Sequence, residues 1–382
     1  MTQHLYFDTN ATTPVLPEVI QAMHPFWAES FGNASSTHPL GRAAEKAVRD
    51  ARRQIAAFLG AAEDQEILFT SGGTESNNTA IRSALAVSGK KQIVTSAVEH
   101  SSVRRLCHQL RKEDFRVTEI GVDSEGRLKM EDLRLALTED TAVVSLMTAN
   151  NETGVLFPVE EIGRLARERG IFFHTDAVQA AGKIPIHLKN SPVDFLSLSA
   201  HKIYGPKGVG ALYVKKGTPF HPLLWGGSQQ RGRRAGTENV PGIVGFAAAC
   251  QIAGENLQQE AARLAGLRDE FEKEIISKIE GALVHGLNTP RLPNTSQIRF
   301  QAIPAETLIA LLEQKGICVS TGSACMSGSP EPSPVLLAMG ISAEDALSAV
   351  RFSFGRQTRQ EDVQILMREV EAAVNRLMAG VS

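Results

Sequence analysis

The sequence of 382 residues has only four cysteines, Cys107, Cys250, Cys318 and Cys325, and none of them forms a C-x-x-C pair. This spacing argues against a disulfide framework and lacks the ligand pattern of a zinc site, so we expect reduced thiols and no bound metal. Cys107 and Cys250 lie in helix-like stretches and are expected to be structural. Cys325 instead lies among Ser, Gly and Pro in "STGSACMSGSPEPSP", a composition typical of loops, where a thiol is more often reactive than buried.

Long apolar runs and strong charge are also missing. The longest apolar segment, "GIVGFAAACQIAG", is too short to span a bilayer, and the N-terminus "MTQHLYFDTN" does not resemble a signal peptide. A net charge of −2 provides no general attraction for nucleic acid or for an anionic membrane. We therefore expect a cytoplasmic protein that binds neither nucleic acid nor membrane.

Short β-rich runs alternate with amphipathic helical stretches from about residue 65 to residue 215. The runs are "EILFT", "QIVTSA", "FRVTEIGV", "TAVVSLMTA", "IFFHTDAV", "DFLSLS" and "GALYV". This alternation predicts an α/β fold with a mostly parallel seven-stranded sheet covered by helices, and a binding site at the carboxyl ends of the strands. After a long helical stretch the strands become fewer, so we expect a large domain of residues 14–258 and a smaller α/β domain of residues 259–382, with the N-terminal arm 1–13 belonging to the smaller domain.

A phosphate site is indicated by "EILFTSGGTESNNTAIRSAL", which reads as a strand, a Gly-Gly turn and a helix with Thr74 and Glu75 near its start. The free backbone N–H groups and the dipole at a helix start favour phosphate. An ordinary turn with a capped helix explains the same segment equally well. The Walker pattern is absent, so a nucleoside triphosphate is not indicated.

Lys202 follows a β-rich run in "DFLSLSAHKIYGPKGVG", which places its amine at the carboxyl end of a strand. Ser199 and His201 could add contacts to a nearby phosphate. Most lysines are solvated surface charges. A lysine beside a phosphate site nevertheless suggests the aldehyde cofactor pyridoxal 5'-phosphate (PLP), bound as a Schiff base.

Three further residues complete the candidate site. Asp176 ends an apolar strand in "FFHTDAVQAAGK" and could face the pyridine nitrogen of PLP, while "TDAVQAA" could also open a helix capped by Asp176. Gln179, one helical turn later, could bind the phenolic oxygen. His100 follows another strand and could stack on the ring and move protons, although a lone histidine is more often structural.

Together these segments resemble the cysteine desulfurases of the NifS/IscS type, members of the class V aminotransferase group of fold-type I PLP enzymes. The resemblance covers nearly the whole chain, in the order "YFDTNATTPV", "FGNASSTHPLGR", "TSGGTESNN", "VEHSS", "NNETG", "HTDAVQ", "SAHKIYGPKGVGALYV", "RRAGTENV", "STGSAC" and "VRFSFGR". It implies a sulfurtransferase that converts L-cysteine to L-alanine. Sulfur would pass as a persulfide on Cys325 to an acceptor protein such as an iron–sulfur scaffold.

The resemblance also implies roles for individual residues. Lys202 would hold PLP, His100 would stack on its ring, Asp176 would face the ring nitrogen and Gln179 the phenolic oxygen. Thr237 would reach the phosphate in a neighbouring subunit, which implies a homodimer. The remaining residues are those expected at the phosphate, namely Gly73, Thr74, Ser199 and His201, and those expected at the substrate's carboxylate, namely Arg351 and Asn151, of which Asn151 would also contact the cofactor.

Around Cys325 the sequence departs from the family's usual pattern at Met326, Pro330 and Pro334. The prolines restrict the backbone, so neither the turnover rate nor the acceptor is predicted. One rival interpretation is another PLP reaction, such as selenocysteine lysis or aminotransfer, for which Cys325 is not required. The other is an inactive scaffold, which has no physical reason to keep Lys202, Asp176 and Cys325.

Overall fold

The computed structural model describes residues 4–322 and 331–379. Its large sheet has the strand order β2-β8-β7-β6-β5-β3-β4, and β8 runs antiparallel to both of its neighbours while the other pairs are parallel. This confirms the predicted seven-stranded, mostly parallel sheet. The strands are β2 (Ile67–Thr70), β3 (Gln92–Ser96), β4 (Arg116–Ile120), β5 (Thr141–Ser145), β6 (Phe172–Asp176), β7 (Phe195–Ser199) and β8 (Gly210–Val214).

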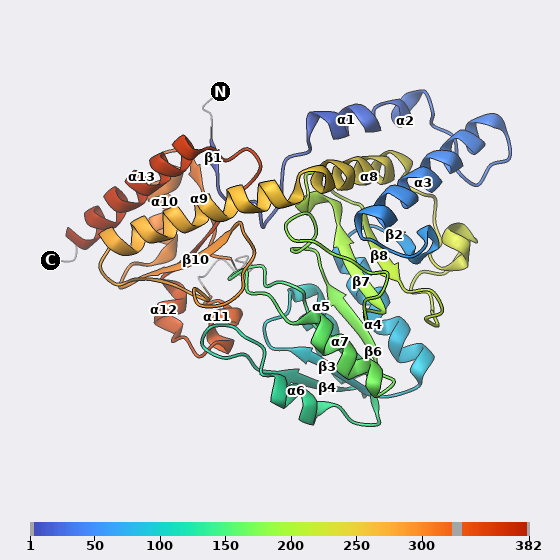
Figure 1. Cartoon of the computed structure of the whole chain (residues 1–382), viewed down its shortest axis with the longest axis horizontal. Helices are drawn as coiled ribbons and strands as arrows, with labels where there is room; N and C mark the ends of the chain where they lie inside the picture. Colours follow the sequence, from blue (N-terminus) through green and yellow to red (C-terminus); the bar gives the residue numbers. More distant parts are fainter. Residues whose placement is uncertain (1–3, 323–330, 380–382) are drawn as a thin grey trace.

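Helices cover this sheet, and its central strands β3, β5 and β7 are therefore buried over their whole length (Figure 1). In α5, the residues Val103, Leu106, Cys107 and Leu110 are buried, which is the spacing of one helix face. Cys250 is buried in α8, so both of these cysteines are structural, as expected. The helices of this part are α1 (Pro17–Met23), α2 (Pro25–Ala28), α3 (Pro39–Phe58), α4 (Gly73–Ser88), α5 (Ser101–Lys112), α6 (Met130–Ala136), α7 (Val159–Glu168) and α8 (Val240–Glu255).

A second, antiparallel sheet has the order β12-β10-β9. Its core is aromatic: the ring of Phe271 lies 4.8 Å from that of Phe352 and 5.7 Å from that of Phe354. In Figure 1, α9 extends from the end of α8 to this second sheet. The elements are α9 (Leu257–Lys278), β9 (Ala282–Val284), β10 (Thr295–Phe300), α10 (Ala305–Glu313), β11 (Ile317–Cys318), α11 (Pro334–Ala338), α12 (Ala343–Leu347), β12 (Ala349–Ser353) and α13 (Gln360–Ala379).

The N-terminal arm joins the two parts of the molecule. Its strand β1 (Leu5–Tyr6) pairs in parallel with β11, which makes Cys318 a strand residue, as expected. Phe7 is buried in the aromatic core of the second sheet. The chain then crosses to the large sheet, where the N–H of Thr13 donates to the carbonyl oxygen of His201 at 3.0 Å.

No helix follows Asp176, so the alternative that "TDAVQAA" opens a helix is wrong, and so is the helical turn expected between Asp176 and Gln179. The segment 177–183 instead forms hydrogen-bonded turns, in which the N–H groups of Ala180 and Ala181 both donate to the carbonyl oxygen of Ala177. A helix cannot continue here because Gly182 has a φ of +73° and Pro185 has no N–H to donate. Gln179 therefore does not lie one helical turn beyond Asp176.

Within the described ranges, no helix combines the length and the apolar character that a membrane crossing requires.

Candidate active site

Strand β7 carries Lys202 to the carboxyl edge of the large sheet. The strand ends at Ser199, and a single 3₁₀ turn, Ala200–Lys202, follows it. The Nζ of Lys202 donates to the carbonyl oxygens of Asn10 at 2.5 Å and Ala11 at 2.8 Å. Burial, together with the charge of Arg351, lowers the pKa of Lys202 from 10.5 to about 8, and Asp8 and Asp176 oppose this shift. At pH 7 about a tenth of the amine is therefore neutral and able to attack an aldehyde.

Asp176 ends the neighbouring strand β6 and is buried at the same edge. Its Oδ1 accepts from the N–H of Val178 at 2.9 Å, and its Oδ2 accepts from Nδ2 of Asn77 at 2.6 Å. The two donors fix the orientation of the carboxylate. Sequence reasoning missed Asn77, a polar residue of α4, because nothing local to α4 indicates a partner on β6.

His100 is the N-cap residue of α5. Its Nδ1 accepts from the N–H of Ser102 at 3.2 Å and lies 2.8 Å from Oγ of the same residue. Because Nδ1 is the acceptor, the neutral ring carries its proton on Nε2. Burial lowers the pKa of His100, Lys202 lowers it further, and Asp176 opposes both effects. The ring is thus a helix cap, and Nε2 remains available for proton exchange.

The start of α4 forms a cradle for an anion. No side chain caps this helix, and the carboxylate of Glu75 is paired with Arg234 at 2.9 Å. A Cβ added at Gly73 would lie 2.8 Å from Cγ2 of Val178, and one added at Gly72 would lie 3.8 Å from Oγ of Ser199. Glycine at position 73 therefore lets the first turn of the helix, which includes Thr74, approach Val178 closely, with the end of β7 beside it. The helix dipole favours a phosphate in this space.

Two of the expected phosphate ligands have other surroundings in the single chain. The Nδ1 of His201 is 3.1 Å from Oγ1 of Thr12 in the arm, and burial lowers the pKa of His201 to about 4. Thr237 is exposed in the loop before α8.

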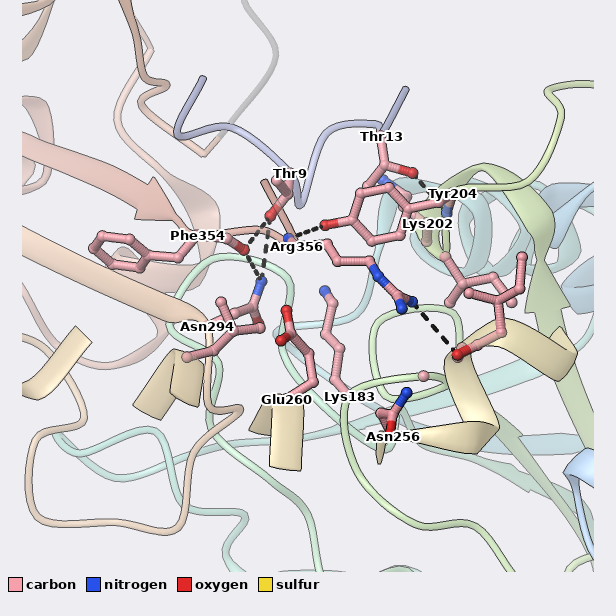
Figure 2. A pocket seen from close by; sticks show the side chains of 15 residues that line it. Thr9, Thr13, Lys183, Lys202, Tyr204, Asn256, Glu260, Asn294, Phe354 and Arg356 are labelled. Atoms are coloured by element: carbon pink, nitrogen blue, oxygen red, sulfur yellow. Dashed lines mark hydrogen bonds between the residues drawn. The ribbon is translucent and has the colours of Figure 1, made fainter. Parts of the chain in front are cut away.

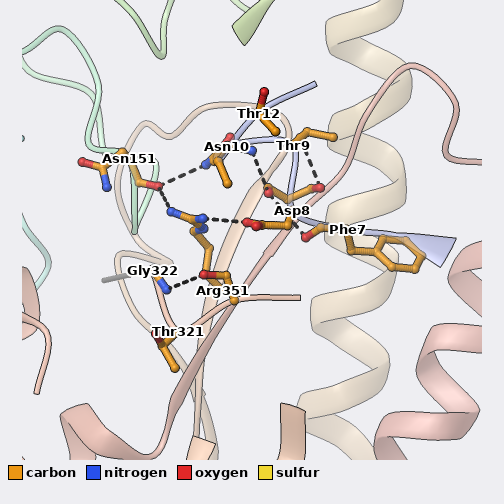
Figure 3. Close-up of polar contacts among 12 residues, drawn as sticks. Phe7, Asp8, Thr9, Asn10, Thr12, Asn151, Thr321, Gly322 and Arg351 are labelled. Atoms are coloured by element: carbon orange, nitrogen blue, oxygen red, sulfur yellow. Dashed lines mark hydrogen bonds and ion pairs between the residues drawn. The ribbon is translucent and has the colours of Figure 1, made fainter. Parts of the chain in front are cut away.

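Arg351 reaches the site from β12 in the second sheet (Figure 3). Its Nη2 is paired with Oδ1 of Asp8 at 2.6 Å, and its Nη1 donates to the backbone oxygen of Asn151 at 3.0 Å. The buried Nε has no partner among the described residues. An unpaired buried donor of this kind can receive a carboxylate.

Sequence reasoning also missed Asn10 and Lys183. The backbone oxygen of Asn10 accepts from Lys202 and from Nε2 of Gln179, and its Oδ1 accepts from Nζ of Lys183 at 2.9 Å. Lys183 also donates to Oε1 of Gln179 at 2.8 Å, and burial holds the pKa of Lys183 well below 10.5. Figure 2 shows Lys183 and Lys202 lining one cavity. Gln179 is thus fixed through the arm rather than through a helix.

Cys325, Met326 and Pro330 lie outside the described residues. Pro334 occupies the first turn of α11, where a proline stabilises a helix start.

Residues 5–366 match the family model described as "Aminotransferase class-V". The cysteine desulfurase of Gluconacetobacter diazotrophicus is 50% identical over 375 residues, which are 98% of this chain and 94% of that protein. The cysteine desulfurase NifS of Azotobacter vinelandii is 50% identical over 374 residues, 98% of this chain and 93% of that protein. The chain belongs to the aminotransferase class-V family.

Solved structures agree with this assignment. A NifS-like protein superposes with a TM-score of 0.91 and 38% identity, covering 98% of this chain and 100% of that chain. The structure "SspA in complex with cysteine" has a TM-score of 0.81 and 35% identity, covering 92% of this chain and 98% of that chain. The predicted fold and the resemblance to cysteine desulfurases are confirmed, and membership of the family implies PLP as cofactor. The lowered pKa of the Lys202 amine, the fixed carboxylate of Asp176 and the uncapped start of α4 fit this cofactor.

We expect covalent uptake of PLP by the cofactor-free protein to depend on pH. The neutral amine of Lys202 is the reactive form, so the initial rate rises about tenfold per pH unit below pH 7 and levels off above about pH 9. Absorbance of the bound cofactor measures this rate, and free Nα-acetyl-lysine serves as the control, with a midpoint near 10.5. A protein midpoint as high as that of the control would contradict the assignment of the low pKa to Lys202.

Proposed function

We propose that the chain is a PLP-dependent cysteine desulfurase that converts L-cysteine to L-alanine and holds the removed sulfur as a persulfide on Cys325. The observation that carries this proposal is the convergence of Lys202, Asp176 and the start of α4 at one edge of the sheet. The cysteine desulfurases that are 50% identical over nearly the whole chain support the reaction. A related protein at 35% identity binds cysteine, which supports the substrate.

The cofactor is held by residues already described. Lys202 binds PLP through its amine, and Asp176 keeps the ring nitrogen protonated. Gln179 binds the phenolic oxygen once its amide gives up one of its partners in the Asn10 network. When bound, PLP supplies a conjugated ring that delocalises the charge left when the substrate's Cα loses a proton. The phosphate is bound by Gly73, Thr74, Ser199 and His201.

The chain's own residues then perform the reaction. Arg351 and Asn151 orient the carboxylate of the substrate, and the neutral amine of Lys202 accepts the proton from Cα. His100 exchanges a proton through Nε2 during sulfur transfer. The thiolate of Cys325 attacks the substrate's Sγ, so that an S–S bond forms as the substrate's Cβ–Sγ bond breaks. Protonation of the carbon skeleton completes alanine, and an acceptor thiol later removes the sulfur.

A homodimer would complete the site. The large apolar side chains exposed in the described part of the single chain include three aromatic ones, namely Trp27 at 66%, Phe31 at 65% and Trp225 at 74%. Aromatic residues of this kind are enriched in protein interfaces. A second copy that covers them would also bring the exposed Thr237 to the phosphate of the neighbouring subunit.

The domain boundaries, the sulfur acceptor and the location in the cell are also proposed. The second hydrophobic cluster, formed by Phe7 and residues between 264 and 374, supports a small domain of residues 259–382 together with the arm 1–13, beside a large domain of residues 14–258. Val335 and Leu336 of α11 instead pack in the core of the large sheet, so α11 lies at the contact between the two domains. An iron–sulfur scaffold protein is the proposed acceptor and the cytoplasm the proposed location, since a persulfide requires a reducing compartment in which thiols stay free.

Incubation of the PLP-loaded chain with L-cysteine and a reductant should yield sulfide and alanine in equal amounts. We expect Cys325→Ala to abolish both products, because no thiolate then attacks the substrate's sulfur. Cys318→Ala is the matched control and should retain turnover, because Cys318 is a residue of β11. Sulfide assay and amino-acid analysis measure the two products. Full turnover by Cys325→Ala would contradict the persulfide step and favour aminotransfer or selenocysteine lysis.

His100→Asn separates proton transfer from structure, because asparagine is a favourable N-cap residue but cannot exchange a proton as Nε2 does. We expect the affinity for PLP to change less than about threefold, while persulfide formation in a single turnover slows about a hundredfold. His108→Asn, at an exposed position of the same helix, should change neither value. Equal losses in PLP binding and in persulfide formation would show that His100 is only structural.

A further inference from the structure

One buried carboxyl, that of Glu152, contacts both ends of the segment that carries Cys325. Its Oε2 accepts a hydrogen bond from Oγ of Ser333 at 2.5 Å. On the other side, a Cβ added at Gly322 would lie only 3.1 Å from both Cγ and Oε2 of Glu152. Residues 323–330 lie between these two contacts in the sequence. Gly322 and Ser333, which flank this segment in the described structure, therefore both lie against the same side chain.

Glu152 is itself held firmly on the large sheet. Its exposed fraction is 4%, and its N–H donates to Oδ1 of Asn150 at 2.9 Å. The same oxygen accepts from the N–H of Thr153 at 3.0 Å, and Nδ2 of Asn150 donates to the carbonyl oxygen of Val98 at 3.1 Å. This arrangement is an Asx turn, which gives the loop a defined backbone conformation. Glu152 is thus a fixed point and not a flexible side chain.

Ser333 has two functions in this arrangement. Its Oγ accepts from the N–H groups of Val335 and Leu336, both at 3.2 Å, and so caps α11. Its hydroxyl hydrogen is donated to Glu152, so the donor and both lone pairs of the hydroxyl are used. Val335 and Leu336 are buried in the core of the large sheet. The contact therefore sets where α11 begins as well as where the preceding segment ends.

Gly322 completes the contact from the other end. Its φ is +94°, a conformation that residues with a side chain rarely adopt. The N–H of Gly322 donates to Oγ of Ser320 at 3.1 Å, and Ser320 forms a bridge with Arg351. Arg351 also donates to the backbone oxygen of Asn151, so Glu152 adjoins a residue expected to bind the substrate and lies against Gly322 and Ser333, which flank the segment that carries Cys325.

We propose that Glu152 is a positioning residue that holds both ends of the Cys325 segment against the loop that carries Asn151. The inference rests on the proposed function, since Cys325 is the nucleophile only in a desulfurase. Loss of the contact lowers the rate of sulfur transfer and leaves substrate binding unchanged, because Arg351 and Asn151 keep their own partners. Burial raises the pKa of Glu152, which is consistent with a carboxyl enclosed between the two ends.

Ser333→Asp tests the contact while it preserves the helix cap, because aspartate is as good an N-cap residue as serine. It places a second carboxylate against Glu152, and we expect kcat for sulfide formation to fall at least about tenfold while KM for L-cysteine changes less than about twofold. Adding Glu152→Gln to Ser333→Asp should recover most of the lost kcat, because the amide can donate to the new carboxylate. Ser342→Ala is the matched control, since Ser342 caps α12 with an exposed hydroxyl.

Hydrogen exchange of the PLP-loaded enzyme provides a readout that does not depend on turnover. We expect the amides of α11 to exchange about tenfold faster in Ser333→Asp, and to return toward the wild-type rate in the double variant. Unchanged exchange, or a double variant no better than Ser333→Asp, would overturn the contact. Faster exchange with an unchanged kcat would overturn the positioning role. A wild-type chain that makes no sulfide would refute the proposed function, while the exchange rates would still decide the contact.

Discussion

The hydrogen bonds of Asn10 hold the arm between the two sheets, and the active site depends on them. Asn10 is 1% exposed, and its N–H donates to Oγ of Ser353 while its Nδ2 donates to Oγ1 of Thr295. Its two oxygens accept from Lys202 and Lys183 on the large-sheet side. Leaving one buried polar group unpaired costs about 1–3 kcal/mol, so each partner constrains the position of the others. The arm thereby fixes the amine of Lys202 relative to the second sheet.

Burial at this edge also sets the chemistry of the groups. An ionisable group that loses its hydration favours its neutral form. Burial therefore lowers the pKa values of Lys202 and His100 and raises the pKa of Glu99 to about 8. Glu99 still accepts hydrogen bonds from Ser96 at 2.7 Å and from the N–H of Met147 at 2.9 Å. The same desolvation that makes the edge costly to fold therefore provides a nucleophilic amine and a neutral imidazole.

Most of the large sheet could be predicted, because β-branched runs and helical periodicity are local signals. Lys202, Asp176 and His100 could be identified because the ends of parallel strands meet at one edge. Asn10, Asn77, Lys183 and Glu152 could not, since their partners lie far away in the sequence and no local pattern indicates a hydrogen bond between distant elements. A helix after Asp176 was one of two interpretations of "TDAVQAA", because this segment has helical composition, and the constraint that prevents a helix comes from Gly182 and Pro185. The pairing of Arg351 with Asp8 depends on the crossing of the arm, which no spacing indicates.

We assign the cofactor to Lys202, although Lys183 is also buried, also has a lowered pKa and lines the same cavity. Borohydride reduction of the PLP-loaded chain, followed by proteolysis and mass spectrometry of the labelled peptides, distinguishes the two lysines directly. We predict the reduced adduct on the peptide that contains Lys202 and an unmodified Lys183. An adduct on Lys183 would contradict the placement of the cofactor between Asp176 and the start of α4.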